Sequence, residues 1–116
     1  MRITGALSLA LFFAVATAEA APARFDAEAV KTNNRGVAEM SQQLTERAAA
    51  SFAEAMKQDP KLAQAAINEG IALMAQQKLD EAKKALAAAL ALDPANAQAW
   101  YNLGLEQHAN LSLIHI

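Results

Sequence analysis

The sequence contains no cysteine, which excludes disulfide bonds, thiol catalysis and thiolate metal sites. Histidine is almost absent as well: only His108 and His115 occur, too few for a histidine-based metal site. Acidic and basic residues nearly balance at a formal net charge of −2, without a long run of either sign. Nucleic acid is therefore not an expected partner, because it requires a basic patch. Aromatic residues make up only 5% of the chain, and the abundant alanine favours closely packed helices.

The N-terminal segment 1–20 has the layout of a secretory signal peptide. Arg2 precedes an apolar run over residues 3–15, and residues 18–20 offer a small-x-small cleavage pattern. The run is shorter than the roughly 20 apolar residues that a membrane span needs. The pattern predicts cleavage after Ala18 or Ala20, no stable membrane span in the mature chain, and export to a bacterial periplasm or to the exterior. An uncleaved N-terminal anchor is the alternative interpretation.

Most of the remaining chain repeats at a fixed period. Gly36, Gly70 and Gly104 are evenly spaced, and an Asp-Pro pair at 59–60 recurs at 93–94 with the same spacing. Superimposing residues 29–62 on 63–96 without a gap gives 12 identities in 34 positions, seven of them other than alanine. A fixed period of this length indicates a repeat architecture in which each unit stacks on its neighbour.

Each repeat is predicted to form two helices. After a linker over residues 21–30, we expect helices at 31–43 and 45–57, at 63–77 and 79–91, and at 97–109. The Asp-Pro pairs separate the helix pairs, because proline lacks an amide donor and pushes the preceding residue out of helical space. Asp80 and Asn96 are predicted to cap the helices that follow them. Apolar residues recur at helical spacing rather than at strand spacing.

The mid-helix glycines require an explanation, since each costs roughly 1 kcal/mol relative to alanine. Close approach of the paired helix would offset this cost if a small residue faced the glycine. Ala48 follows Gly36 at the same interval at which Ala82 follows Gly70. We therefore expect these glycine–alanine pairs to face each other.

The segments AQAWYNLGL (97–105) and LDEAKKALAAALALDP (79–94) resemble the tetratricopeptide repeat. The resemblance covers residues 29–110 and implies an all-α solenoid of antiparallel helix pairs, about two and a half repeats long (29–62, 63–96 and a partial 97–110). Departures occur in the first repeats, where Thr32 and Ala66 fill the tryptophan slot and Arg35 and Glu69 the leucine slot. The first pair is therefore expected to be a more polar edge repeat. The matched structural positions are Gly36, Ala48, Phe52, Ala55, Pro60, Gly70, Ala82, Leu86, Ala89, Pro94, Trp100, Leu103 and Gly104, with Trp100 expected in the core.

In that family the concave surface binds protein segments, and the resemblance places nine residues of this chain there. They are mainly apolar, and the basic residues with which some members clamp a C-terminal carboxylate are not among them. The resemblance therefore implies an apolar helix or extended segment as partner. The expected groove residues are Asn33, Val37, Met40, Ile67, Ile71, Met74, Tyr101, Leu105 and His108.

The C-terminal segment 111–116 does not continue the repeat. The register predicts a small residue at 116, where Ile116 stands, and the string LSLIHI resembles the translated start of a sequencing adapter. We interpret it as an artefact of a truncated read; a natural hydrophobic tail covering the end of the solenoid is the alternative.

Nothing in the sequence predicts catalysis. The glycines are single and helical rather than grouped in a phosphate-binding loop. Neither Ser41 nor Ser51 has a histidine at matching helical spacing, and the other two serines lie in the signal segment and in the tail. We expect a non-catalytic interaction scaffold of the cell envelope or exterior, without cofactor, metal or small-molecule substrate. The alternative is an accessory N-terminal region of a larger exported protein. The signal peptide, the NNRGVA opening, the second repeat and AWYNLGL together also resemble the start of bacterial proteins with an FG-GAP-type propeller.

Overall fold

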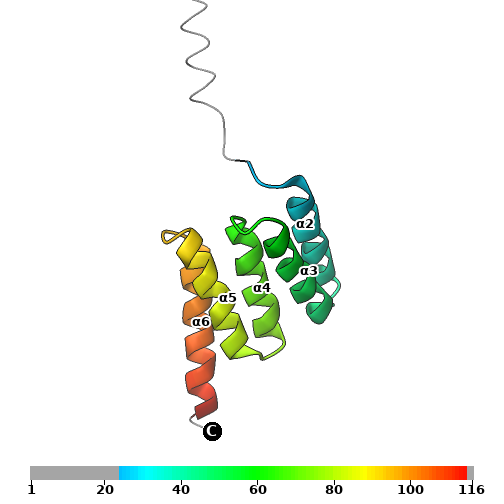
Figure 1. The fold of residues 1–116 in the computed structure, drawn as a ribbon. Helices are drawn as coiled ribbons and strands as arrows, with labels where there is room; N and C mark the ends of the chain where they lie inside the picture. The colour runs from blue at the N-terminus through cyan, green and yellow to red at the C-terminus, as the bar shows by residue number, and fades with distance from the viewer. Residues whose placement is uncertain (1–23, 115–116) are drawn as a thin grey trace, which may run out of the picture.

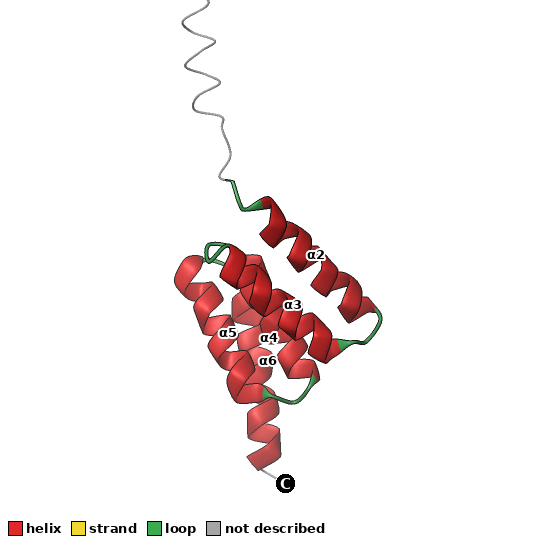
Figure 2. Cartoon of the chain, turned by 45° about the vertical axis from the view of Figure 1, so that its right-hand side comes forward, coloured by secondary structure: helices red, strands yellow, loops and turns green. Residues whose placement is uncertain are grey.

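The computed structural model describes residues 24–114, and it describes side chains for residues 24–105. This part of the chain is entirely helix and connecting turn (Figures 1 and 2). The signal peptide expected at 1–20 lies outside the described residues, as do residues 115–116. The helices are α2 (Ala27–Ser41), α3 (Thr45–Gln58), α4 (Ala63–Ala75), α5 (Leu79–Leu92) and α6 (Ala97–Ile114).

The predicted helix ranges agree closely with these bounds, except at the two ends. α2 begins at Ala27 rather than at residue 31, so the second part of the linker predicted at 21–30 is helical. Asp26 explains this start, because its carboxylate accepts a hydrogen bond from the Ala29 N–H at 3.0 Å. At the other end, α6 runs through residues 111–114, since no glycine or proline stands there to end it.

Asp59 ties the start of the first pair to the start of the second. Its carboxylate accepts the N–H of Asp26 at 2.8 Å and the N–H of Lys61 at 3.0 Å. These two donors hold the pKa of Asp59 below its ordinary value. The Asp-Pro pair therefore does more than interrupt the helices: the carboxylate of Asp59 satisfies one backbone donor at the start of α2 and one in its own turn.

The two turns inside the pairs share one geometry. Gln43 and Gln77 have positive φ values of 62° and 64°. The Leu44 N–H bonds the Glu39 carbonyl at 2.9 Å, and the Lys78 N–H repeats the bond one period later. This 6→1 bond is the Schellman motif that closes a helix C-terminus. Glutamine occupies the left-handed position that glycine usually fills.

Of the two predicted caps, one is confirmed. The Asn96 side chain accepts the Ala99 N–H at 3.0 Å and so caps the start of α6. Asp80 does not cap α5, because the helix already begins at Leu79, and Lys78 takes the cap position without a side-chain bond. Asp80 instead lies in the first turn, where its charge favours the N-terminal end of the helix.

The helices form two rows. α2, α4 and α6 contact one another in sequence along the inner row, while α3 and α5 of the outer row each pack against inner helices. Figure 1 shows the pairs stacked side by side from α2 to α6. The fold is therefore an all-α solenoid of antiparallel helix pairs, as the repeat period predicts.

The core lies between the rows and is built from few large side chains. Phe52, Ile67 and Leu86 are the largest residues that are completely buried. Around them the repeat alanines are fully buried as well, which lets the helix backbones approach closely. These alanines are Ala48, Ala55, Ala82 and Ala89.

The glycines pack differently from the prediction. A Cβ added at Gly36 would lie 2.5 Å from the Phe52 ring, and one at Gly70 would lie 2.8 Å from Leu86 Cγ. The alanine expected opposite Gly70 contributes only its backbone, since the Ala82 carbonyl oxygen would be 3.4 Å away. Each of these glycines therefore makes room for a large side chain of the paired helix, Phe52 or Leu86. The alanine expected to face the glycine lies one turn before that large side chain.

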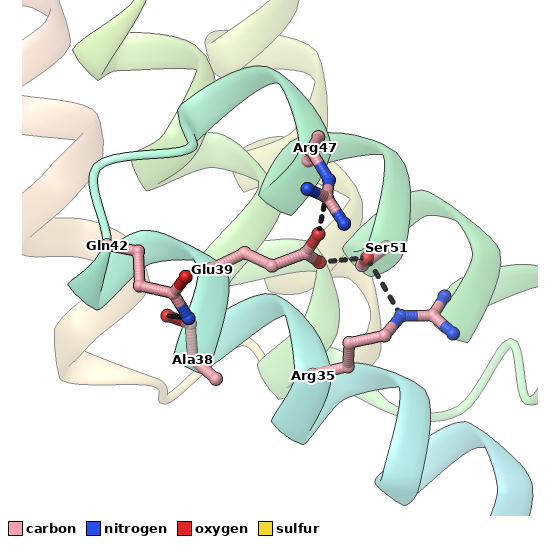
Figure 3. Close-up of polar contacts among 6 residues, drawn as sticks. All are labelled: Arg35, Ala38, Glu39, Gln42, Arg47 and Ser51. Carbon is pink, nitrogen blue, oxygen red and sulfur yellow. Dashed lines mark hydrogen bonds and ion pairs between the residues drawn. The ribbon is translucent and has the colours of Figure 1, made fainter.

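The first pair ends the solenoid with a polar cluster between α2 and α3 (Figure 3). Glu39 is buried, accepts the Ser51 hydroxyl, and pairs with Arg47 at 3.1 Å; the Arg35 guanidinium donates to Ser51 at 3.3 Å. One period later, Leu73 and Ala85 replace Glu39 and Ser51 and pack beside Ala49 of α3. The polar residues thus stand where no preceding pair covers the described helices, which confirms a more polar first repeat.

Trp100 is not in the core, contrary to the sequence prediction. Its side chain is 56% exposed, and its indole N–H donates to the Pro94 carbonyl at 2.9 Å. The equivalent positions, Thr32 and Ala66, are buried, and Ala66 packs in one cluster with Leu86 and Ala89 of α5. Within residues 24–114, α6 packs against α4 and α5 on one side, and no described helix follows it to cover Trp100, which stays in contact with solvent.

Glu69 lies half-buried on α4, at the position of Arg35 one period earlier. Burial, and then the negative charge of Glu81, raise its pKa. Because the pKa of Glu69 is raised in the folded state, the stability that the protonated carboxyl contributes is fully present below its ordinary pKa. That stability is lost as pH rises through the folded pKa.

We therefore expect Glu69→Gln to raise the melting temperature near pH 7, with the gain disappearing toward about pH 4, where the carboxyl is protonated in both states. Glu81→Gln should give a smaller gain of the same sign; a lower melting temperature for Glu69→Gln would contradict the account.

Candidate peptide-binding groove

A hollow of about 160 Å³ opens on the inner row between α2 and α4. Both helices contribute walls, and α3 contributes the floor through the ring of Phe52, the residue that packs over Gly36. No charged side chain lines the hollow. Its lining residues are Val37, Met40, Phe52, Asn68 and Ile71.

Three of the predicted groove residues meet in this hollow. Val37 is 49% exposed, while Met40 and Ile71 are partly buried and keep some surface toward solvent. A partner that covers such a half-exposed apolar side chain gains about 25 cal/mol of binding free energy per Å² of apolar surface removed from water. The hollow therefore has the properties of a small docking site for an apolar side chain.

The other predicted groove residues lie elsewhere. Ile67 differs most from the expectation: it has no exposed surface and belongs to the core with Leu86 and Ala66. Met74 packs against that same cluster. Tyr101 and Leu105 are exposed on α6, outside the lining of the hollow. The side chain of His108 is outside the described residues.

Asn33 is buried and belongs to a row of amide side chains along the inner helices. Asn68 donates to the Asn33 side-chain oxygen at 3.0 Å, linking α4 to α2. Gln64 donates to Asn68 at 3.1 Å and to Gln98 on α6 at 3.3 Å. These amides tie the three inner helices together next to the apolar hollow.

Sequence reasoning missed the contribution of Asn68 and Phe52 to the hollow. Asparagine recurs at 34, 68 and 102, which indicates a role for this position in the repeat. The recurrence does not reveal which of these asparagines faces the groove. Phe52 was predicted as a structural residue, and its side chain is buried. That its ring also forms the groove floor depends on the gap that Gly36 leaves in α2.

The described residues offer little else that resembles a site. A larger depression of about 390 Å³ surrounds the α2–α3 turn, but the consecutive residues 43–47 line it, so it is the surface of one turn. No group of histidine, cysteine, aspartate and glutamate side chains in this part of the chain could hold a metal ion. Nor is any described helix long and apolar enough to cross a membrane.

Comparison with known proteins identifies the repeat. Residues 70–110 match the family model described as TPR repeat. One similar structure is the second TPR domain of human RPAP3, solved in complex with the HSP70 peptide SGPTIEEVD. It superimposes with a TM-score of 0.66 at 30% sequence identity, and the match covers 68% of this chain and 66% of that chain. The Sgt2 TPR domain from Aspergillus fumigatus gives a TM-score of 0.72 at 23% identity, covering 75% of this chain and 58% of that one.

A third similar structure is the second TPR of Spaghetti (RPAP3), bound to the HSP90 peptide SRMEEVD. It gives a TM-score of 0.71 at 24% identity, covering 75% of this chain and 81% of that one. A search of curated protein sequences finds no match. The structural similarity and the repeat pattern therefore establish the shared fold. This chain covers only 66% of the RPAP3 domain and 58% of the Sgt2 domain.

Proposed function

Because its helix pairs are tetratricopeptide repeats, we propose that the chain is a protein-interaction scaffold that binds an apolar helix or extended segment in the groove between α2 and α4. The observation that carries this proposal is the uncharged hollow formed by Val37, Met40, Phe52 and Ile71. Support also comes from the second TPR domain of human RPAP3, which is 30% identical to this chain and is solved in complex with a peptide.

The chemistry of the groove favours an apolar side chain over an acidic peptide. A carboxylate is bound strongly by arginine or lysine, and neither lines the hollow. Asn68 at the edge can both donate and accept hydrogen bonds, which suits the backbone of an extended segment. The proposed partner therefore inserts an apolar side chain above Phe52 and bonds Asn68 through its backbone.

We also propose that the chain is exported and that its role is non-catalytic. We place the chain in the cell envelope or exterior on the basis of the signal-peptide pattern at residues 1–20. Binding a protein segment in an uncharged groove requires no catalytic group, so the scaffold role is non-enzymatic.

Panning a phage-displayed random peptide library against the chain tests the groove. We expect enrichment of peptides with clustered apolar residues, and loss of that enrichment for Val37→Glu, because a carboxylate beside the hollow would have to be desolvated. Val37 is half exposed, so the melting temperature should stay nearly unchanged. Ala87→Glu, which adds the same group to an exposed position of α5, is the matched control.

Direct binding of the labelled peptide SGPTIEEVD separates this groove from that of the human relative. We expect no saturable binding, since no cationic side chain lines the hollow. Tight binding that persists in Val37→Glu would contradict the proposed apolar partner.

A further inference from the structure

Met40 combines apolar packing with access to solvent. It lies in the last turn of α2, lines the hollow between α2 and α4, and is partly buried. Its side chain also packs against the buried cluster of Ala48, Phe52 and Ala72. Among the described residues that line the hollow, its thioether is the only sulfur group. An oxidisable side chain therefore stands in the site that the proposed function gives to an apolar side chain of the partner.

The other two methionines in the described part of the chain are placed differently. Met56 and Met74 are also partly buried, but each packs against two of the buried clusters of the core. Neither belongs to the lining of the hollow, whereas Met40 does. A small oxidant that enters the hollow from solvent should therefore react with Met40 first, because the sulfur must be reached for oxidation to occur.

A hydroperoxide is the class of oxidant that the reaction needs. The sulfur lone pair attacks one oxygen of hydrogen peroxide and forms the S–O bond while the O–O bond breaks. The departing hydroxide takes the proton of the transferred oxygen and leaves as water, so the thioether is oxidised and the peroxide is reduced. The product, methionine sulfoxide, is polar where methionine is apolar, and methionine sulfoxide reductases reverse the change, one enzyme for each epimer.

A sulfoxide changes what the hollow can bind. The described lining is uncharged, and Val37, Phe52 and Ile71 are apolar. An apolar side chain that covers the sulfoxide oxygen removes its water without replacing the hydrogen bonds, which opposes binding. Asn68 is the amide in this lining, and its N–H groups can donate to the sulfoxide oxygen. The oxidised side chain would then compete for the group that bonds the partner backbone.

We propose that Met40 is an oxidation site that switches the groove, so that the thioether form binds the apolar partner segment and the sulfoxide form releases it. This inference rests on the proposed function, because it concerns the regulation of the same groove. A bound segment covers the hollow and shields the Met40 sulfur from peroxide. Binding of the partner and oxidation of Met40 therefore oppose each other.

The test compares the full chain before and after limited treatment with hydrogen peroxide. The probe is a fluorescein-labelled peptide enriched by panning against the untreated chain, and fluorescence polarisation measures its Kd. Peptide mapping by mass spectrometry should find the sulfoxide first at Met40, and the bound peptide should slow its formation. We expect the Kd to rise about tenfold or more with oxidation of Met40. Treatment with both methionine sulfoxide reductases should restore the affinity.

Met40→Leu is the matched variant, since leucine conserves the apolar volume and carries no sulfur. It should bind the peptide as the untreated chain does and keep that affinity after peroxide. Met74→Leu, which changes the same residue type outside the hollow, should remain as sensitive to peroxide as the unaltered chain. Circular dichroism of the chain oxidised at Met40 should show the helical content kept, which separates a change in the groove from unfolding.

Three results would overturn the switch while leaving the proposed function in place. These are equal affinity before and after oxidation of Met40, a loss of binding that Met40→Leu does not prevent, and unfolding of the chain when Met40 is oxidised. If the untreated chain enriches no apolar peptide, the proposed function fails, and the switch fails with it.

Discussion

Gly70→Leu is expected to unfold the pairing of α4 with α5 at room temperature. Even a Cβ at this position would lie 2.8 Å from Leu86 Cγ and 3.4 Å from the Ala82 carbonyl oxygen, and a whole leucine must displace both. Leu86 is completely buried, in one cluster with Ala66, Ile67, Ala89 and Ala99. Overpacking of a core typically costs about 1–3 kcal/mol and occasionally more, which is a large part of the stability of a small domain.

Thermal unfolding followed by circular dichroism measures the effect, and the chain supplies two controls. Gly104→Leu makes the same chemical change where nothing lies within 4 Å, and we expect it to raise the melting temperature. Lys84→Ala changes an exposed residue and should leave the melting temperature nearly unchanged. Similar melting temperatures for the two glycine variants would contradict the packing described for Gly70.

Phe52→Ala is expected to have an effect of comparable size on the first pair. The ring is buried, packs over Gly36, and belongs to a cluster with Ala48 and Ala72. Removing a buried phenylalanine side chain costs about 3–5 kcal/mol, because the cavity is only partly refilled. Denaturant unfolding should show this loss, and Phe52→Leu should cost far less, since leucine holds the same position over Gly70.

A double-mutant cycle tests whether the ring and the glycine form one unit. Gly36→Ala alone should destabilise the chain, because its Cβ would lie 2.5 Å from the Phe52 ring. In the Phe52→Ala background that collision is gone, and the alanine should recover part of the loss through its better helix propensity. We expect a coupling energy of about 1–3 kcal/mol; additive effects would show that the two positions act independently.

The groove and the exposed residues of α6 differ in how far the sequence predicts them. Val37, Met40 and Ile71 follow from the repeat register and do line the hollow. Ile67 occupies the same register position as Tyr101, yet it is buried while Tyr101 is exposed. The difference arises because α4 has helix pairs on both sides, whereas α6 has a described neighbour on one side only.

The sequence by itself determines the elements and their order. A fixed repeat period, two Asp-Pro interruptions and helical spacing of apolar residues specify the described helices closely away from the ends of the chain. These are local properties: proline removes a backbone donor wherever the chain folds, and alanine-rich segments favour helix without long-range contacts. The polar first pair is equally visible, because charged residues replace apolar ones in the repeat.

Tertiary structure decides which side chains share a space. The sequence shows that Gly36 and Gly70 recur, but only the packing of the outer helices reveals that Phe52 and Leu86 occupy the room they leave. The exposure of Trp100 is decided in the same way, by whether a helix covers α6 and not by the residue itself. Burial depends on the neighbours that the fold brings together, and a repeat pattern assigns every unit the same neighbours although the end units have fewer.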